Sequence, residues 1–157
     1  MSVDGSEVLE RSAAGGPLNI GLLCFIVSRA MEDRVLADLA AEGFDDLTLA
    51  QGRVFARIGP KGTRLTDLAE QARVTKQTAG FLVDQLERAG YVRRAPDPTD
   101  ARARLVVIAE RGVAAVEVAR RTEAAVQAEW TRYLGRRATV QLHRTLTRLR
   151  EITDPYR

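Results

Sequence analysis

The sequence has very few residues of the kinds that build redox, metal and hydrolytic centres. Among its 157 residues there is one cysteine, Cys24, and one histidine, His143. A single cysteine excludes an intramolecular disulfide and a multi-cysteine metal site, and a single histidine leaves almost no material for a histidine metal centre or a catalytic triad. A glycine-rich phosphate-binding loop is also missing. We therefore expect a protein that is not an enzyme and that uses no metal or cofactor.

Long apolar runs are missing as well. The apolar stretch 20–27 is too short to span a bilayer, and charged residues follow it from Arg29 onward. Residues 1–16 carry glycine, serine and scattered acids, without the positive flank and apolar run of a secretory signal. We expect a cytoplasmic protein that makes no membrane contact and begins with a flexible tail over residues 1–16.

Aromatic residues make up only 5% of the chain, whereas hydrophobic residues make up 45% and charged residues 29%. This composition favours one soluble, mainly helical domain with a few short strands. The net charge of +3 is modest, but its placement is informative. Nine basic and six acidic residues lie in the segment 61–104, which therefore carries as large an excess of positive charge as the whole chain.

Apolar residues at three- and four-residue steps predict two helices in the first third of the chain. The first is expected to begin with Pro17 in its first turn and to end near Gly43. The second follows a capping box formed by Thr48 and Gln51 and is expected to stop at 59–60.

The next segment has the spacing of a helix-turn-helix. A short extended piece, 62–65, precedes Thr66, which is expected to cap a brief helix over 67–72. After a turn of two residues, Thr75 is expected to cap a longer helix over 76–89 that Gly90 closes.

The pattern then changes to β-rich runs at 91–94 and 104–108, joined by a polar connection over 96–102. These runs predict a two-stranded hairpin with an extended tip, a wing. A long helix is expected over 110–134, Gly135 interrupts it, and a last helix is expected over 138–152.

The stretch LTDLAEQARVTKQTAGFLVDQLERAGYV, from Leu65 to Val92, continues into a wing with the motif Asp-x-Arg at Asp100 and Arg102. Together with the flanking long helices, it resembles the MarR (multiple antibiotic resistance regulator) family along nearly the whole chain. The resemblance implies a mainly α (α+β) fold, with a winged helix-turn-helix over 46–109 and helical dimerisation regions over 17–45 and 110–157, in one intertwined domain. It implies a transcription regulator that binds double-stranded DNA as a homodimer.

One position departs from the family pattern. The second wing strand usually ends in Leu-Thr, whose threonine caps the following helix, but this chain has Ile108 and Ala109 there. We expect that cap to be missing, the start of the next helix to fray, and a cost of roughly 1 kcal/mol.

The helix over 76–89 is expected to read DNA. At 100° per residue, one face carries Ala79, Leu82, Val83, Leu86 and Ala89 and should face the core, whereas the other carries Gln77, Phe81, Asp84 and Arg88, with Gly80 beside them. Glutamine can bond bidentately to adenine and an apolar ring can touch a thymine methyl group. The residues expected to contact DNA are Arg64, Thr75, Lys76, Gln77, Thr78, Gly80, Phe81, Arg88, Arg93, Arg94, Asp100, Arg102 and Arg104.

Arg102 is expected to enter the minor groove, whose negative potential attracts arginine. The resemblance implies that Asp100 orients it by a charge-assisted bond. Arg64, Arg93, Arg94 and Arg104 are expected to contact phosphates, which position a protein on DNA without reading sequence. Asp84, one turn before Arg88, could pair with it.

The apolar stripes of the first helix and the last two helices need a partner surface, and the resemblance implies that they interlock between two subunits. It also implies a small aromatic or phenolic effector and repression released by that effector. Cys24 resembles the sensor cysteine of a hydroperoxide-sensing branch of the family, but its apolar neighbours favour a buried packing residue over a redox switch. A winged-helix protein-interaction module without DNA affinity is the remaining alternative.

Overall fold

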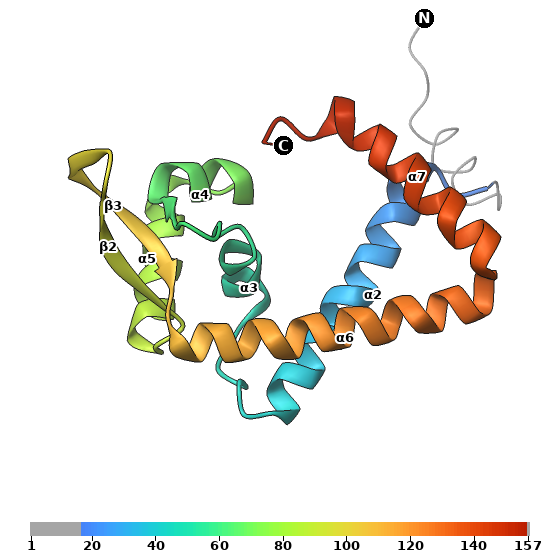
Figure 1. The fold of residues 1–157 in the computed structure, drawn as a ribbon, viewed down its shortest axis with the longest axis horizontal. Coiled ribbons are helices and arrows are strands. Elements are labelled where there is room, and N and C mark those ends of the chain that lie inside the picture. The colour runs from blue at the N-terminus through green and yellow to red at the C-terminus, as the bar shows by residue number, and fades with distance from the viewer. Residues whose placement is uncertain (1–16, 157) are drawn as a thin grey trace, which may run out of the picture. The chain divides into compact units, whose positions relative to one another are not determined.

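The computed structural model describes residues 17–156, so the expected tail over 1–16 lies outside the described residues. The chain divides into two compact units, and the boundary between them in the sequence falls between Met31 and Glu32. The elements are α2 (Ile20–Ala41), α3 (Leu49–Phe55), β1 (Thr63–Arg64), α4 (Leu65–Ala72), α5 (Lys76–Arg88), β2 (Val92–Asp97), β3 (Asp100–Ile108), α6 (Glu110–Leu134) and α7 (Arg136–Thr153) (Figure 1). The predicted mainly helical winged helix-turn-helix is confirmed.

The first unit contributes only residues 17–31 to the description, which include the first turns of α2. None of these residues is buried, and the seven large apolar side chains among them are 41–71% exposed. They are Leu18, Ile20, Leu22, Leu23, Phe25, Ile26 and Val27.

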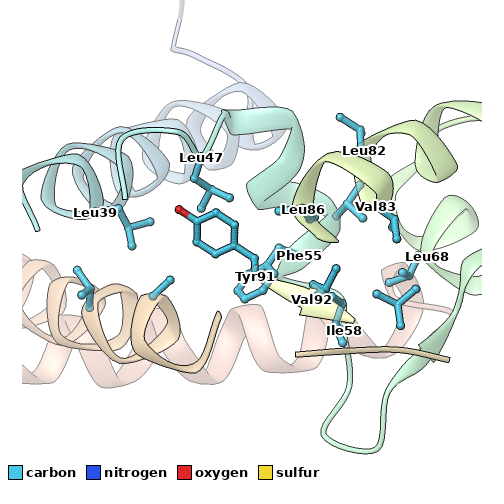
Figure 2. Close-up of a cluster of buried hydrophobic side chains, with 14 residues drawn as sticks. Leu39, Leu47, Phe55, Ile58, Leu68, Leu82, Val83, Leu86, Tyr91 and Val92 are labelled. Atoms are coloured by element: carbon cyan, nitrogen blue, oxygen red, sulfur yellow. The ribbon is translucent and has the colours of Figure 1, made fainter. Parts of the chain in front are cut away.

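The second unit, from Glu32 onward, folds around one apolar core (Figure 2). Tyr91 is 1% exposed, and its ring lies 6.2 Å from that of Phe44 and 6.3 Å from that of Phe55. Side chains from α2, α3, α4, α5, the sheet and α6 complete the core: Leu39, Val54, Leu68, Leu82, Val83, Leu86, Val106, Ala115 and Val118. The helix-turn-helix and the wing are therefore packed on the same core as the start of α6.

The three strands form an antiparallel sheet in the order β1-β3-β2. Arg64 pairs with Leu105, and Val92 pairs with Ile108. The predicted polar connection over 96–102 is wrong in detail, because β2 extends to Asp97 and β3 begins at Asp100. Only Pro98 and Thr99 of this segment lie outside the strands. The other polar residues belong to paired strands and lie mostly on the exposed side, so their polarity did not indicate a loop.

Several predicted helix starts and ends are also wrong. Pro17 precedes α2, where the Asn19 side chain accepts a 2.9 Å hydrogen bond from the Leu22 amide. α3 ends at Phe55 and not at 59–60. Thr66 lies inside α4, whose N-cap is Arg64, because pairing with β3 keeps the backbone of Arg64 extended up to the helix.

α6 begins at Glu110, as predicted, and the missing cap is confirmed because no side chain of Ala109 caps it. Its first turn packs closely on the sheet, since a Cβ added to Gly112 would lie 2.1 Å from the Tyr91 carbonyl oxygen. Gly135, at φ 81°, ends α6, and α7 follows with no buried residue. None of the helices in the described chain is long and apolar enough to cross a membrane.

Candidate nucleic-acid interface

α5 presents the two faces that its sequence predicts. Thr75 caps it, since its hydroxyl accepts a 3.0 Å hydrogen bond from the Thr78 amide. The predicted core face is confirmed, because four of its residues are buried and Ala89 is half-buried; the four are Ala79, Leu82, Val83 and Leu86. The helix is thereby fixed in rotation, with its other face directed away from the core.

The outward face of α5 is exposed and mixed in chemistry. Gln77, Asp84 and Arg88 are exposed. The Phe81 side chain is 58% exposed as well, so it is a large apolar residue that does not belong to the core. A Cβ added at Gly80 would lie 3.7 Å from Leu65, an ordinary contact, so packing within the chain does not require glycine at that position. Lys76 and Thr78 are exposed in the first turn of the same helix.

The suggested ion pair between Asp84 and Arg88 is wrong. Arg88 donates to the backbone oxygen of Asp84 at 3.2 Å, whereas the Asp84 carboxylate lies 2.6 Å from the Arg94 guanidinium. Arg94 also binds the Glu87 carboxylate, which accepts a 2.9 Å bond from the Arg94 amide. The bond to Asp84 is the main reason that the pKa of Arg94 is raised. Arg94 therefore joins β2 to α5 and balances the two acids of that helix.

Arg64 is likewise engaged within the protein. Its guanidinium lies 2.6 Å from the carboxylate of Asp97, which is 7% exposed. The Asp97 carboxylate also accepts hydrogen bonds from the hydroxyl and amide of Thr99, at 2.7 and 2.8 Å. These bonds, with that of Arg64, lower the pKa of Asp97 to about 2.

Sequence reasoning missed Asp97, which anchors the wing turn. The sequence did contain a signal, because Asp97 is followed by Pro98 and Thr99. An aspartate at the start of a turn typically accepts a hydrogen bond from the backbone amide two residues later.

At the wing, Asp100 does not orient the Arg102 side chain as expected. Its carboxylate accepts a 3.0 Å bond from the Arg102 amide and lies 3.9 Å from the Arg64 guanidinium. Arg102 is exposed, as are Arg93 and Arg104. None of these three side chains makes an ion pair or hydrogen bond with another part of the described chain. The structure thus divides these five arginines into two engaged ones, Arg64 and Arg94, and three unengaged ones, which are Arg93 and Arg104, predicted to contact phosphates, and Arg102, predicted to enter the minor groove.

The hairpin of β2 and β3 lies beside α5 (Figure 1). The exposed face of α5 and the three unengaged wing arginines consequently belong to adjoining elements of the same unit. No group of three or more metal-binding side chains occurs in residues 17–156. The unengaged guanidinium groups give this surface the capacity to bind anions.

Cys24 lies in α2 and is exposed, so its predicted burial is wrong within a single chain. Its neighbours Leu23 and Phe25 are exposed with it, 46% and 54% respectively.

Residues 45–103, the helix-turn-helix and most of the wing, match the model of the MarR family. No match was found among curated proteins. Among solved structures, the chain is similar to the reduced form of MarR from E. coli, with 23% identity, a TM-score of 0.70, and coverage of 86% of this chain and 98% of that one.

Two further structures show the same fold. The transcriptional regulator Tm0710 from Thermotoga maritima is 24% identical with a TM-score of 0.61, covering 85% of this chain and 93% of that one. A mutant of MepR from S. aureus, bound to an oligodeoxyribonucleotide, is 20% identical with a TM-score of 0.55, covering 85% and 96%. The resemblance to the MarR family is thus confirmed, in sequence over residues 45–103 and in fold over most of the chain.

Proposed function

We propose that the protein regulates transcription by binding duplex DNA as a symmetric homodimer. The observation that carries this proposal is the exposed face of α5, where Phe81 is 58% exposed between Gln77 and Asp84, beside a wing with unengaged arginines. A rotationally fixed helix of this kind can enter the major groove, where glutamine and an apolar ring can distinguish base pairs. The MepR complex, a protein of the same fold, contains an oligodeoxyribonucleotide.

Because some of the predicted arginines are engaged within the protein and others are not, the two groups are given different roles. Arg93, Arg102 and Arg104 are available to phosphates and to the minor groove, and Thr75, Lys76 and Thr78 stand at the N-terminal end of the reading helix, where anions are favoured. Arg64, Arg94 and Asp100 act mainly by holding the wing and α5 in place. Arg88 lies at the far end of the same helix and suits backbone contact.

The dimer is proposed because each of the two units has exposed apolar side chains among its described residues. In α7, Leu142, Leu146 and Leu149 are 39–47% exposed on one face, and the apolar residues of 17–31 are exposed as well. Contiguous apolar surfaces of this kind mark association sites in soluble proteins. A two-fold dimer would present two reading helices to the two halves of a palindromic site.

We further propose that the dimer represses transcription in the cytoplasm and that a small aromatic or phenolic effector releases it. The effector would act by favouring one spacing of the two reading helices over the other. A hollow of about 500 Å³ is lined by Arg57, Gln71, Tyr156 and the ion pair of Arg150 with Asp154, among others, and offers polar and aromatic groups to such a molecule.

Genome-fragment selection with the purified protein tests the proposal. We expect a recovered site with two-fold symmetry and half-sites about 10 base pairs apart, bound with an affinity that falls steeply as salt rises. Phe81→Ala should abolish the preference for that site, whereas Arg120→Ala, at an exposed position of α6, should leave it intact. A monomer that enriches no fragment, or binds a protein with salt-insensitive affinity, would overturn it.

The peroxide-sensing alternative rests on the exposure of Cys24 and has a separate test. If it is correct, peroxide releases DNA from the native protein but not from Cys24→Ser. Equal release from both proteins, or from neither, excludes it.

A further inference from the structure

α7 carries more positive charge than any other element. Its eighteen residues contain five arginines and one acid, Glu151, so their net charge of +4 exceeds the +3 of the entire chain. Residues 61–104 contribute a further +3, which means that the rest of the chain is net negative. Positive charge is therefore gathered at two separate places, and the proposed DNA-reading surface uses only one of them.

Three of the five arginines in α7 lie on one line along the helix. Arg137, Arg144 and Arg148 are spaced by seven and four residues, which places them within about 40° of one another around an α-helix. Along the axis they span about 16 Å. We call these three residues the arginine row.

The side chains of the arginine row are exposed and make no ion pair or hydrogen bond with any described residue. Arg150, in the same helix, differs because it pairs with Asp154 at 2.7 Å. Three guanidinium groups that are unpaired on one face of a helix retain their full capacity to bind anions.

The arginine row lies opposite the apolar stripe of α7. Leu142, Leu146 and Leu149 point about 140–200° around the helix from Arg144. If the leucines are covered by a second copy of the chain, as proposed above, the arginine row stays on the outside of the assembly. A helix lying on a membrane by its leucines would turn the row away from the lipid headgroups.

The two basic surfaces lie on different elements. α7 begins at the far end of α6, whose 25 residues extend about 37 Å from the base of the wing, and then turns back, so that Arg150 near its C-terminal end lines a hollow with Arg57 and Gln71 (Figure 1). The arginine row therefore belongs to a helix outside the wing and the reading helix, and we treat it as a second basic surface.

We propose that the arginine row binds the phosphate backbone of a second DNA duplex, so that the protein bridges two DNA segments. Each strand of a duplex carries one phosphate for about every 3.4 Å of the helix axis, so a row of about 16 Å can face several phosphates at once. The basic groups are all arginine, whose planar fork matches phosphate oxygens bidentately. The contact would read no sequence, because it touches only the backbone.

A capture experiment with the full-length protein tests this proposal. One duplex is fixed to beads, and a second, labelled duplex of random sequence is captured through the protein. The row variant is Arg137→Gln/Arg144→Gln/Arg148→Gln. The matched control removes the same charge at exposed arginines outside the row, as Arg120→Gln/Arg132→Gln/Arg136→Gln.

We expect the wild type and the control to capture the second duplex and the row variant to lose the capture while it still binds the first. The salt dependence of second-duplex binding should fall in slope by about 2 to 3, at roughly 0.9 for each phosphate contact. Equal capture by the row variant and the control would overturn the proposal. Competition by polyglutamate as effective as by DNA, or row-dependent binding to anionic vesicles, would also overturn it, by identifying another partner class.

The outcome is separable from that of the proposed function. If α5 and the wing do not bind DNA, all binding of a duplex by the wild type depends on the arginine row. That binding is lost in the row variant and kept in Arg102→Ala. If neither the row variant nor Arg102→Ala changes the binding of a single duplex, that binding depends on neither basic surface, and the bridging proposal is wrong.

Discussion

The Tyr91 hydroxyl donates a 2.5 Å hydrogen bond to the carboxylate of Asp46, an exposed residue at the edge of the core of the second unit. Arg111 binds the same carboxylate at 2.8 and 2.9 Å, and its guanidinium lies 4.4 Å from the centre of the Tyr91 ring. Asp46 belongs to the loop after α2, Tyr91 precedes β2, and Arg111 lies in the first turn of α6. These contacts join α6 and the loop after α2 to the start of the wing at one point.

Tyr91→Phe removes one bond from this cluster and leaves the ring in place. We expect the free energy of unfolding to fall by about 1 kcal/mol, the usual value for one intramolecular hydrogen bond. Asp46→Asn should cost more, because it also removes the carboxylate from Arg111. Urea unfolding of the three proteins measures both effects, and a Tyr91→Phe protein as stable as the wild type would show that the hydroxyl bond is not formed.

The Asp97 carboxylate should make the wing region sensitive to acid. Its pKa is lowered from 3.8 to about 2, chiefly by the Thr99 hydroxyl and amide and by Arg64. A carboxyl group with a lowered pKa stabilises the fold above its ordinary pKa and loses this contribution as the pH falls through the folded-state value. The stabilisation should therefore be complete above about pH 4 and be lost between about pH 4 and pH 2.

Asp97→Asn is the matching variant. Its unfolding midpoint should be lower than that of the wild type at pH 6, and the difference should shrink as the pH approaches 2. The measurement is thermal unfolding at several pH values. A difference that stays constant across the range would assign the loss to packing alone and contradict the charge-based account.

Substitution by alanine should lower the free energy of unfolding at one glycine and raise it at another. A Cβ at Gly112 would lie 2.1 Å from the Tyr91 carbonyl oxygen and 2.8 Å from the Ile108 side chain, so Gly112→Ala must move α6 away from the sheet. We expect a loss of about 1–3 kcal/mol or more. Gly52 lies within α3 with no atom near such a Cβ, and Gly52→Ala should stabilise the protein by about 0.5–1 kcal/mol. Denaturant unfolding measures both, and a gain in Gly112→Ala would show that the contact relaxes easily.

The missing cap of α6 offers a stabilising substitution. Ala109 is the N-cap, and its backbone has the extended conformation that a capping threonine adopts. Ala109→Thr should raise the free energy of unfolding by about 0.5–1 kcal/mol. Ala109→Val, which has the same shape without the oxygen, serves as the control. Equal stability of the two variants would contradict the capping explanation.

The features that the sequence predicts well are the local ones. The bounds and faces of α5 follow from Thr75, Gly90 and an apolar period within a single helix. The family resemblance places the wing and the long helices around it. These signals need no knowledge of which distant segments come together, and for this reason they survive comparison with the structure.

The features that sequence reasoning missed depend on contacts between distant segments. Arg64 and Asp97 are 33 positions apart, and Arg94 finds its acids on the preceding helix. A list of exposed arginines cannot separate those that hold the wing from those that remain available to DNA. Only the fold makes that division, and it changes the expected role of Arg64 and Arg94 from phosphate contact to positioning.

This division predicts different behaviour for two arginines of the wing. Arg102 has no partner in the described chain, so Arg102→Ala should weaken binding to the selected site severalfold or more, without changing the dimer or its stability. Arg94→Gln should also weaken binding, but by leaving Asp84 and Glu87 unbalanced near the DNA. Adding Asp84→Asn should therefore restore much of the loss in Arg94→Gln and little of the loss in Arg102→Ala. Binding titrations of the two single and two double variants measure this, and equal restoration in both backgrounds would mean that Arg94 contributes only its charge.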